Sequence, residues 1–134
     1  MDFFTAMEVS ASGLSAQRTR MNVAASNLAN VNTTKADGGG AYARKSVMLE
    51  SVPYPGSGIN GVRVQQIVSD ANPPREEYDP EHIDADADGY VYYPNINPVE
   101  EMVDMITASR AYEAGVTALS TSVSMAERAL GIGR

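Results

Sequence analysis

Apolar residues recur at alternating intervals of three and four positions near both ends of the chain. In the first series every member except Arg18 is apolar: Phe4, Met7, Ala11, Leu14, Arg18, Met21, Ala25 and Leu28. In the second series every member except Ser109 is apolar: Met102, Met105, Ser109, Tyr112, Val116, Leu119, Val123, Ala126 and Leu130. This spacing is typical of helices that pack along a coiled-coil seam, so we predict one long helix near each terminus.

The sequence also marks where these helices should begin and end. The first should end in the stretch NLANVNTT, since its asparagines and β-branched threonines weaken helical preference. The second should begin at Pro98, which is followed by acidic residues that suit the positive end of a helix dipole. Gly131 and Gly133 should end it. The chain therefore divides into three parts: 1–34, 35–97 and 98–134.

The middle part has a different composition, because it holds six of the seven prolines. Residues 42–52, 61–69 and 89–94 are rich in β-forming residues and are predicted to be short strands. The acidic segment 70–88 is predicted to be an extended loop. The expected fold class is mostly α with a small β-rich insert. In it the terminal helices pair as an antiparallel coiled-coil hairpin, and the middle consists of short strands and loops.

Two interpretations of the helices remain open at this stage. In the first, they form an ordinary helical hairpin or the core helices of a compact domain. In the second, they pack against other subunits. Two such helices paired with each other bury only one seam. Their polar faces carry Ser, Thr, Ala and Asn more than Lys and Glu, which suits close contact with neighbouring chains.

Charge and composition exclude several classes of function. The eight acidic residues and single arginine of segment 70–88 account for the whole net charge of −7, and the chain lacks the basic stripe that nucleic-acid binding needs. There is no cysteine, and His82 is the one histidine, which argues against thiol, zinc or triad chemistry. The first residues lack the features of a cleaved secretion signal, and no apolar run reaches the ~18 residues of a membrane span.

The stretch DADADGYV (84–91) opens like a calcium-binding loop, with Asp84, Asp86 and Asp88 followed by Gly89. Counting from Asp84, however, the twelfth position is Asn95, which cannot supply the bidentate carboxylate of an EF-hand. Three interpretations remain: an acidic turn leading into a strand, a calcium site, or a contact with a basic patch on a neighbour. Motifs of P-loop proteins, zinc proteases and serine hydrolases are absent, so no enzyme activity, cofactor or small-molecule substrate is expected.

Three motifs, in order, carry a resemblance to a known family. ASGLSAQRTRMNVAASNLANVNTT (11–34) resembles the N-terminal signature of bacterial flagellar rod and hook proteins, with NLANVNT as its most diagnostic part. NPVEEMVDMITASRAYEAG (97–115) resembles their C-terminal signature. The intervening residues look like those of the proximal rod member. The chain is thus identified as similar to flagellar basal-body rod proteins over nearly its whole length.

The resemblance implies a structural subunit of the flagellar basal-body rod. Such subunits polymerise through their terminal helices into a hollow axial tube that transmits motor torque and allows export through its lumen. The implied location is the periplasmic rod, reached through the flagellar type III export apparatus without a cleaved signal. The implied partners are other copies of the chain, other rod proteins, and the ring and adaptor proteins of the inner membrane.

Seventeen residues are expected to take part in assembly or interfaces: Gly13, Leu14, Met21, Asn27, Leu28, Asn30, Val31, Asn32, Thr33, Met102, Met105, Tyr112, Gly115, Val116, Leu119, Val123 and Leu130. We expect the N-terminal stripe to pack against the C-terminal one, with Leu28 beside Met102. At least one of the three signature asparagines should bond to backbone. Gly13 and Gly115 should mark a close approach of the partner helix or of a neighbouring subunit. The alternatives are a local bend that fits the helices to a curved tube wall, or sequence drift at positions that face solvent.

Overall fold

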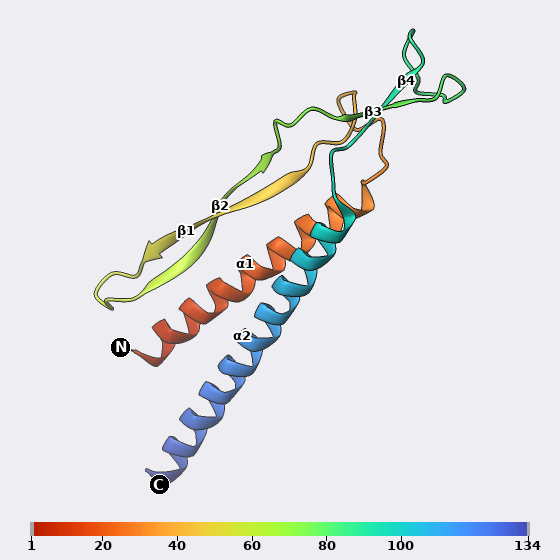
Figure 1. Cartoon of the computed structure of the whole chain (residues 1–134). Coiled ribbons are helices and arrows are strands. Elements are labelled where there is room, and N and C mark those ends of the chain that lie inside the picture. Colours follow the sequence, from red (N-terminus) through yellow and green to blue (C-terminus); the bar gives the residue numbers. More distant parts are fainter. Residues whose placement is uncertain (1, 134) are drawn as a thin grey trace.

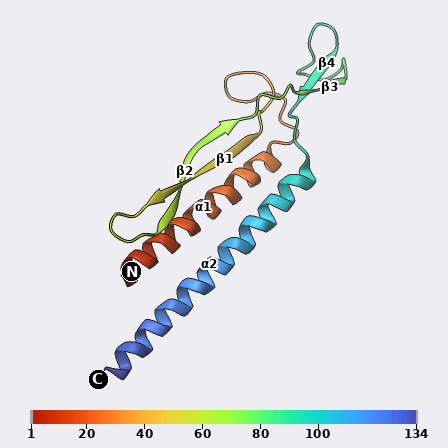
Figure 2. The same cartoon turned by 60° about the vertical axis from the view of Figure 1, so that its left-hand side comes forward.

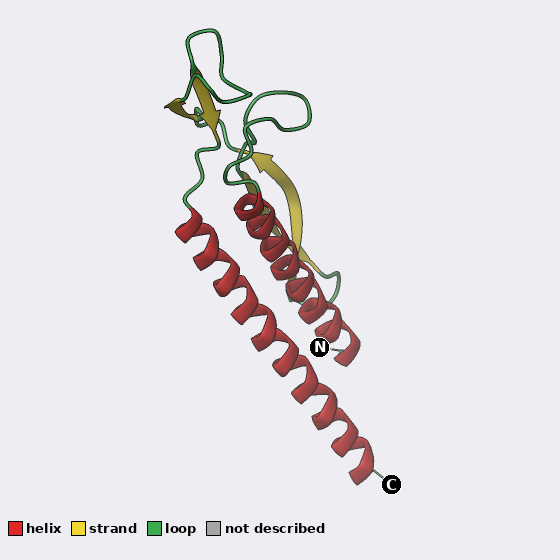
Figure 3. Cartoon of the chain, turned by 90° about the vertical axis from the view of Figure 1, so that its right-hand side faces the viewer, coloured by secondary structure: helices red, strands yellow, loops and turns green. Residues whose placement is uncertain are grey.

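The computed structural model describes residues 2–133 and shows two long helices joined by a middle of four short strands (Figures 1 and 3). The elements, in chain order, are α1 (Phe3–Ala29), β1 (Lys45–Pro53), β2 (Asn60–Ser69), β3 (Arg75–Tyr78), β4 (Tyr90–Tyr93) and α2 (Pro98–Ile132). The predicted class, mostly α with a small β insert, is confirmed. Among the described residues, neither helix combines the length and the apolar character needed to cross a membrane.

Helix α2 begins at the predicted Pro98 and helix α1 ends in the asparagine signature as predicted, whereas Gly131 lies inside α2 and does not end it. The Asn97 side chain accepts a bond from the backbone N–H of Val99, and Pro98 occupies the first turn of α2, where its missing N–H costs nothing. Gly133 caps the C-terminal end of α2. Helix α1 starts after Asp2, whose carboxylate faces the N–H of Phe4, and stops at Asn30 in the asparagine-rich signature.

The two helices lie side by side and run in opposite directions (Figures 1 and 2). Asn27 near the end of α1 bonds to Glu101 near the start of α2, and Leu14 lies against Gly115. This register is close to the expected pairing of Leu28 with Met102.

Helix α1 is the middle layer, with α2 on one side and the hairpin of β1 and β2 on the other (Figure 2). None of the described strands packs on α2. Helix α1 is therefore covered on two sides, and α2 on one side only.

The β1–β2 hairpin is antiparallel, with Lys45 opposite Ser69 and Pro53 opposite Asn60. Its two strands match the predicted strands closely, because both are rich in β-forming residues and a Pro/Gly-rich connector separates them. The hairpin is attached to α1 by Ser12, whose hydroxyl accepts a bond from the N–H of Val62 at 3.2 Å.

The second sheet corrects one prediction. Residues 75–78 lie in the segment expected to be an extended loop, yet they form β3 and pair antiparallel with β4. All four side chains of β3 are exposed, so its sequence has no buried face to signal a strand. Contacts with β4 hold it instead: the Tyr78 and Tyr90 rings meet edge to face at 5.4 Å, and Arg75 lies over Tyr93.

Candidate assembly site

The face of α2 that meets α1 is a rotated version of the predicted stripe. Four of its positions are seven residues apart and are small or polar: Glu101, Ala108, Gly115 and Ser122. Glu101 and Ala108 are fully buried, a side-chain carbon of Leu14 lies 2.7 Å from where a Cβ of residue 115 would stand, and Ser122 lines a groove with α1 residues.

The predicted stripe keeps six residues that are half-buried in the structure: Met105, Ser109, Tyr112, Leu119, Val123 and Ala126. The other predicted positions differ, because Met102 and Val116 are exposed while their neighbours Glu101 and Gly115 face α1. Small residues allow the helices to approach closely, and a reading based on apolar side chains alone misses them. Met102 and Val116 consequently remain uncovered in the single chain.

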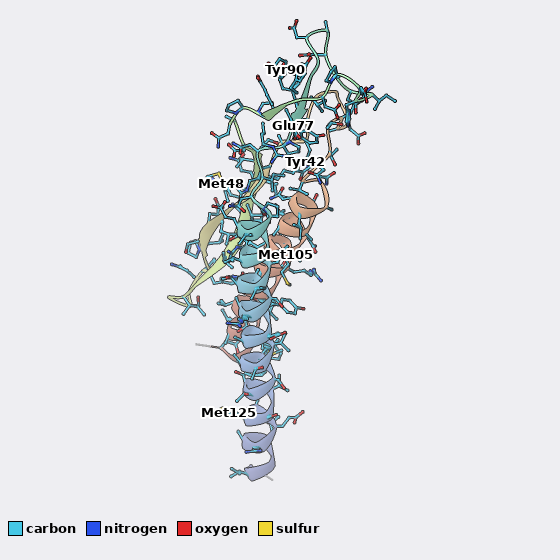
Figure 4. All side chains as sticks on the ribbon, turned by 45° about the vertical axis from the view of Figure 1, so that its right-hand side comes forward. Tyr42, Met48, Glu77, Tyr90, Met105 and Met125 are labelled. Atoms are coloured by element: carbon cyan, nitrogen blue, oxygen red, sulfur yellow. The ribbon has the colours of Figure 1, made fainter. Side chains whose placement is uncertain are left out.

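The remaining assembly residues fall into two groups by exposure. One group is half-buried: Leu14, Met21, Leu28, Asn30, Val31, Thr33, Met105, Tyr112, Leu119 and Val123. The other is exposed: Asn32, Met102, Val116 and Leu130. Figure 4 shows Met105 beside the upper part of the helix pair and Met125 near the free end of α2.

The two helix glycines occupy different surroundings. Gly115 lies against Leu14 of α1, so the close approach expected there is present. Gly13 faces open space, with no atom within 4 Å of an added Cβ. The expected approach of α2 to Gly13 is therefore wrong for the single chain, because the chain places Leu14, not Gly13, against α2.

A buried asparagine joins three elements at the end of the helix pair. The side chain of Asn27 is 1% exposed. Its amide nitrogen donates to the backbone oxygen of Lys45 at 2.8 Å, and its amide oxygen accepts from the backbone nitrogen of Lys45 at 2.9 Å. A neighbouring β-strand would offer β1 this same pair of bonds. Asn27 thus fixes the start of β1 against α1.

The second donor and the second acceptor position of the Asn27 amide are also hydrogen-bonded. Its oxygen accepts from the Tyr42 hydroxyl at 3.0 Å, and its nitrogen donates to Glu101 at 3.2 Å. An asparagine amide offers two donors and two acceptor positions, so all four are satisfied. Buried polar groups that are fully bonded specify one arrangement, and here that arrangement sets α1, β1 and α2 relative to one another.

Glu101 is a buried carboxylate, 1% exposed, and Arg44 neutralises it. The Arg44 guanidinium donates to Glu101 at 2.5 Å, reaches Asp104 at 3.6 Å, and also donates to Ser46. The hydrogen bond with Glu101 raises the pKa of Arg44, so the guanidinium stays charged. A buried charge without such a partner would destabilise the fold strongly. We call Asn27, Tyr42, Arg44, Lys45 and Glu101 the polar junction.

The other signature asparagines lie at the end of α1. The Asn30 side chain donates to the backbone oxygen of Ser26 at 2.8 Å and accepts from the Thr33 hydroxyl at 3.0 Å. It thereby satisfies one of the last helix carbonyls, which have no partner within the helix. The prediction that at least one asparagine bonds to backbone is confirmed by Asn27 and Asn30. The sequence did not indicate the role of Tyr42, Arg44 or Lys45.

The acidic stretch forms the predicted turn ending at Gly89 and leading into β4. The Asp86 carboxylate accepts from the backbone N–H groups of Asp88 and Tyr90 and from the Tyr92 hydroxyl. These bonds, led by the one from Tyr90, lower the pKa of Asp86. Gly89 has a φ of +85°, which side-chain-bearing residues rarely adopt. Within residues 2–133, no three acidic or histidine side chains converge as metal ligands.

Comparisons with known proteins agree with the placement of these motifs. The family model "Flagella basal body rod protein" matches residues 7–36, which span most of α1 and the asparagine signature. The model "Flagellar basal body rod FlgEFG protein C-terminal" matches residues 87–132, which span β4 and α2.

Curated relatives match the chain over its length. The "Flagellar basal-body rod protein FlgC" of Borreliella burgdorferi is 43% identical over 98% of both chains. The protein of the same name from Bacillus subtilis is 41% identical over the whole of both chains. That from Aquifex aeolicus is 45% identical over 96% of this chain and 95% of the relative. Together with the two family models, these identities confirm the resemblance, and the chain belongs to the FlgC family of flagellar basal-body rod proteins.

Proposed function

We propose that this structural subunit of the flagellar basal-body rod polymerises through α1 and α2 into a hollow axial tube. The observation that carries the proposal is the one-sided packing of α2. Its uncovered surface carries eight exposed apolar side chains: Val99, Met102, Val103, Ile106, Val116, Met125, Leu130 and Ile132. The first four lie within about two turns of the helix, and clustered exposed apolar side chains on a folded chain mark a surface that binds another protein.

Energetic arguments support assembly as the state in which this chain is stable. Few side chains are buried within the subunit, and the fully buried apolar ones are Ala16, Ala24, Val91, Ile96 and Ala108. Complete burial of a large apolar side chain contributes about 1.5–3 kcal/mol. The uncovered side of α2 therefore offers apolar surface that neighbouring copies would bury.

The chain divides in this proposal into an inner coiled-coil domain, residues 1–34 and 98–134, and an outer segment, residues 35–97. The hairpin's position on the side of α1 away from α2 supports the division. The seventeen assembly residues lie on the inner domain. The exposed members of that set, Asn32, Met102, Val116 and Leu130, would meet other subunits, and the half-buried ones of the two helices would set the helix seam.

The proposed location and partners follow from the family. The subunit would lie in the periplasmic part of the basal body, after export by the flagellar type III apparatus without a cleaved signal. It would contact its own copies, other rod proteins, and the ring and adaptor proteins of the inner membrane. Torque would pass along the tube and exported proteins through its lumen, so this role requires no catalysis and no cofactor.

A charge on the uncovered side of α2 tests the proposal. Val103 is exposed in the single chain, so Val103→Glu should leave the helix content of the purified subunit unchanged. In cells without the wild-type protein, Val103→Glu should abolish rods in isolated basal bodies and stop swimming, while Val103→Ile should support both. Normal rods built from Val103→Glu would contradict polymerisation through this surface.

A further inference from the structure

The seam between the two helices repeats every seven residues along α2. After Glu101, the positions at this spacing are all small: Ala108, Gly115, Ser122 and Ala129. If α2 moved along α1 by one heptad, ~10 Å at 1.5 Å per residue, each small residue would take the place of the one before it. Packing along the seam therefore distinguishes poorly between the two registers.

The lengths of the two helices also allow such a slip. Helix α2 has 35 residues and α1 has 27, so α2 is longer by eight, slightly more than one heptad. Figures 1 and 3 show the C-terminal end of α2 projecting beyond the start of α1. In the slipped register this end would gain a helix beside it, while residues 98–104 would leave α1 and lengthen the connection to β4. The paired length would stay about the same.

The contact of Leu14 with α2 opposes the slip only weakly. In the slipped register Leu14 would face Ser122 instead of Gly115. A Cβ at position 115 would stand 2.7 Å from a terminal methyl carbon of Leu14. A leucine methyl group can move away by a change of rotamer, so this contact costs little to rearrange.

The start of α2 is held to the rest of the molecule mainly through one side chain. Among residues 98–104, Glu101 is buried, Asp104 is half-buried and the other five are exposed. Glu101 accepts hydrogen bonds from Arg44 and from Asn27. In the slipped register Ala108 would replace Glu101, and the buried amide of Asn27 would lose an acceptor. A buried donor without a partner is costly, and this cost falls on the slipped register alone.

We propose that the Arg44–Glu101 ion pair, bonded to Asn27, is a register lock that excludes a one-heptad slip of α2 along α1. Buried polar groups are known to fix the register of paired helices, at some cost in stability. The register lock acts within one chain and does not depend on polymerisation. It holds the uncovered apolar side of α2 at one height relative to the β1–β2 hairpin.

Engineered disulfides report the register, because the chain contains no cysteine of its own. Leu14→Cys with Gly115→Cys (the 14/115 pair) reports the observed register, since the Leu14 Cγ lies 3.5 Å from a Cβ at position 115 and the new sulfur would replace it. Leu14→Cys with Ser122→Cys (the 14/122 pair) reports the slipped register. In the observed register its two positions differ in height by ~10 Å, beyond the reach of a disulfide.

A third pair controls for fraying of the helices. Leu14→Cys with Ala118→Cys (the 14/118 pair) uses an exposed position of α2 between the other two. Neither register brings this position against Leu14, so a disulfide would form there only if the helices separate and meet at random.

The lock is removed by replacing both charged residues together, since removing one alone leaves the other charge without its partner. The full-length purified chain is oxidised in dilute solution, so that disulfides form within one copy. With the lock present, the 14/115 pair should close and the 14/122 pair should not. In the Arg44→Met/Glu101→Leu chain, the 14/122 pair should close to an extent comparable with 14/115, while 14/118 stays open and the helix content is unchanged.

Three results would overturn the inference. The first is a 14/122 disulfide that stays at background level in the folded Arg44→Met/Glu101→Leu chain. The second is an equal yield of the 14/122 and 14/118 disulfides, which would show fraying instead of a slip. The third is a 14/122 disulfide in the chain that keeps the ion pair.

A second variant covers the case in which two large apolar side chains do not fit the junction. Glu101→Ala extends the series of small residues to the start of α2, and Arg44 can turn to solvent because 27% of its side chain is already exposed. This variant should also give the 14/122 disulfide. Loss of helix content in both variants would overturn the inference, because the ion pair would then be required for folding and not for register.

Discussion

At the scale of single residues, Asn27 has the most specific role that the structure assigns. Its amide bonds to the backbone of Lys45 and to the side chains of Tyr42 and Glu101. Aspartate has the same shape but no N–H groups, so it would lose both donated bonds. Asn27 therefore has a physical reason to be an asparagine, beyond ending a helix.

Asn27→Asp should destabilise the isolated subunit by about 3–5 kcal/mol, since it places a second carboxylate beside buried Glu101. Adding Glu101→Gln should restore part of that loss, because the new amide can donate to the aspartate. Urea unfolding of the four variants of this cycle measures the coupling. Asn32→Asp, at an exposed position, is the control and should change stability by less than about 0.5 kcal/mol. A double variant no more stable than Asn27→Asp would contradict this account.

The turn around Asp86 should respond to acid. The folded-state pKa of this carboxyl lies below its ordinary 3.8, so the ionised form stabilises the turn. That contribution is complete above the unfolded pKa and is lost as pH falls through the lower folded value. Amide exchange of Tyr90, followed by NMR from pH 6 to 2, should show the turn opening at the acid end. Asp86→Asn should remove this pH dependence, and an unchanged profile would count against the role of Asp86.

At the scale of elements, the helix pair depends on small residues more than on large apolar ones. Ala108 and Gly115 on α2 let α1 approach, and Leu14 fills the space above Gly115. At Gly13, by contrast, a Cβ would meet no atom within 4 Å in the single chain. Each glycine lowers helix stability by ~1 kcal/mol relative to alanine. Replacing them should nevertheless have different effects, because their surroundings differ.

Gly13→Ala should raise the free energy of unfolding by about 0.5–1 kcal/mol, since it restores helix propensity without a clash. Gly115→Ala should gain less or destabilise, because its Cβ would stand 2.7 Å from a Leu14 methyl and force that side chain to move. Urea titration of the two variants gives the comparison. Equal gains at both positions would show that Leu14 does not need the space above Gly115.

Gly13→Leu then separates folding from assembly. The open surroundings of Gly13 predict an unchanged subunit fold, whereas a close neighbouring helix in the rod would exclude the leucine. We expect soluble Gly13→Leu subunits that build no rods, as judged by electron microscopy of basal bodies. Rods of normal yield would leave Gly13 without a packing role.

At the scale of the whole molecule, the subunit is long and thin and has no central core. Helix α1 is covered by the hairpin and by α2, but α2 and the β3–β4 tip are mostly exposed (Figures 1 and 2). Segments with few buried contacts open most easily. The order of this molecule should therefore increase when neighbours cover α2.

Hydrogen exchange should reveal that gain. In the isolated subunit, amides of residues 127–132 should exchange fastest within α2, and those around Ala16 and Ala24 of α1 should be the best protected, because these side chains are buried. In assembled rods the difference should shrink as α2 becomes covered. Exchange of residues 127–132 that is equally fast in rods would show that this end of α2 stays free.

The sequence by itself determined the features that depend on neighbouring residues. The three-and-four spacing, Pro98 and the asparagine signature located both helices. A β-rich composition and a Pro/Gly-rich connector located β1 and β2. Helix caps, periodicity and turns are local interactions. The signatures at 11–34 and 97–115 also identified the family. These features require no knowledge of which distant segments meet.

Only the tertiary structure decided the features that join distant segments. Strand β3 forms because β4 lies beside it. The face of α2 that meets α1 includes Ala108 and Gly115, because α1 approaches most closely where side chains are small. The polar junction links Asn27 to Lys45, eighteen positions away, and to Glu101, seventy-four positions away. A buried hydrogen bond between such residues leaves no periodic trace in the sequence, since its strength comes from exclusion of water at a place that exists only once the chain has folded.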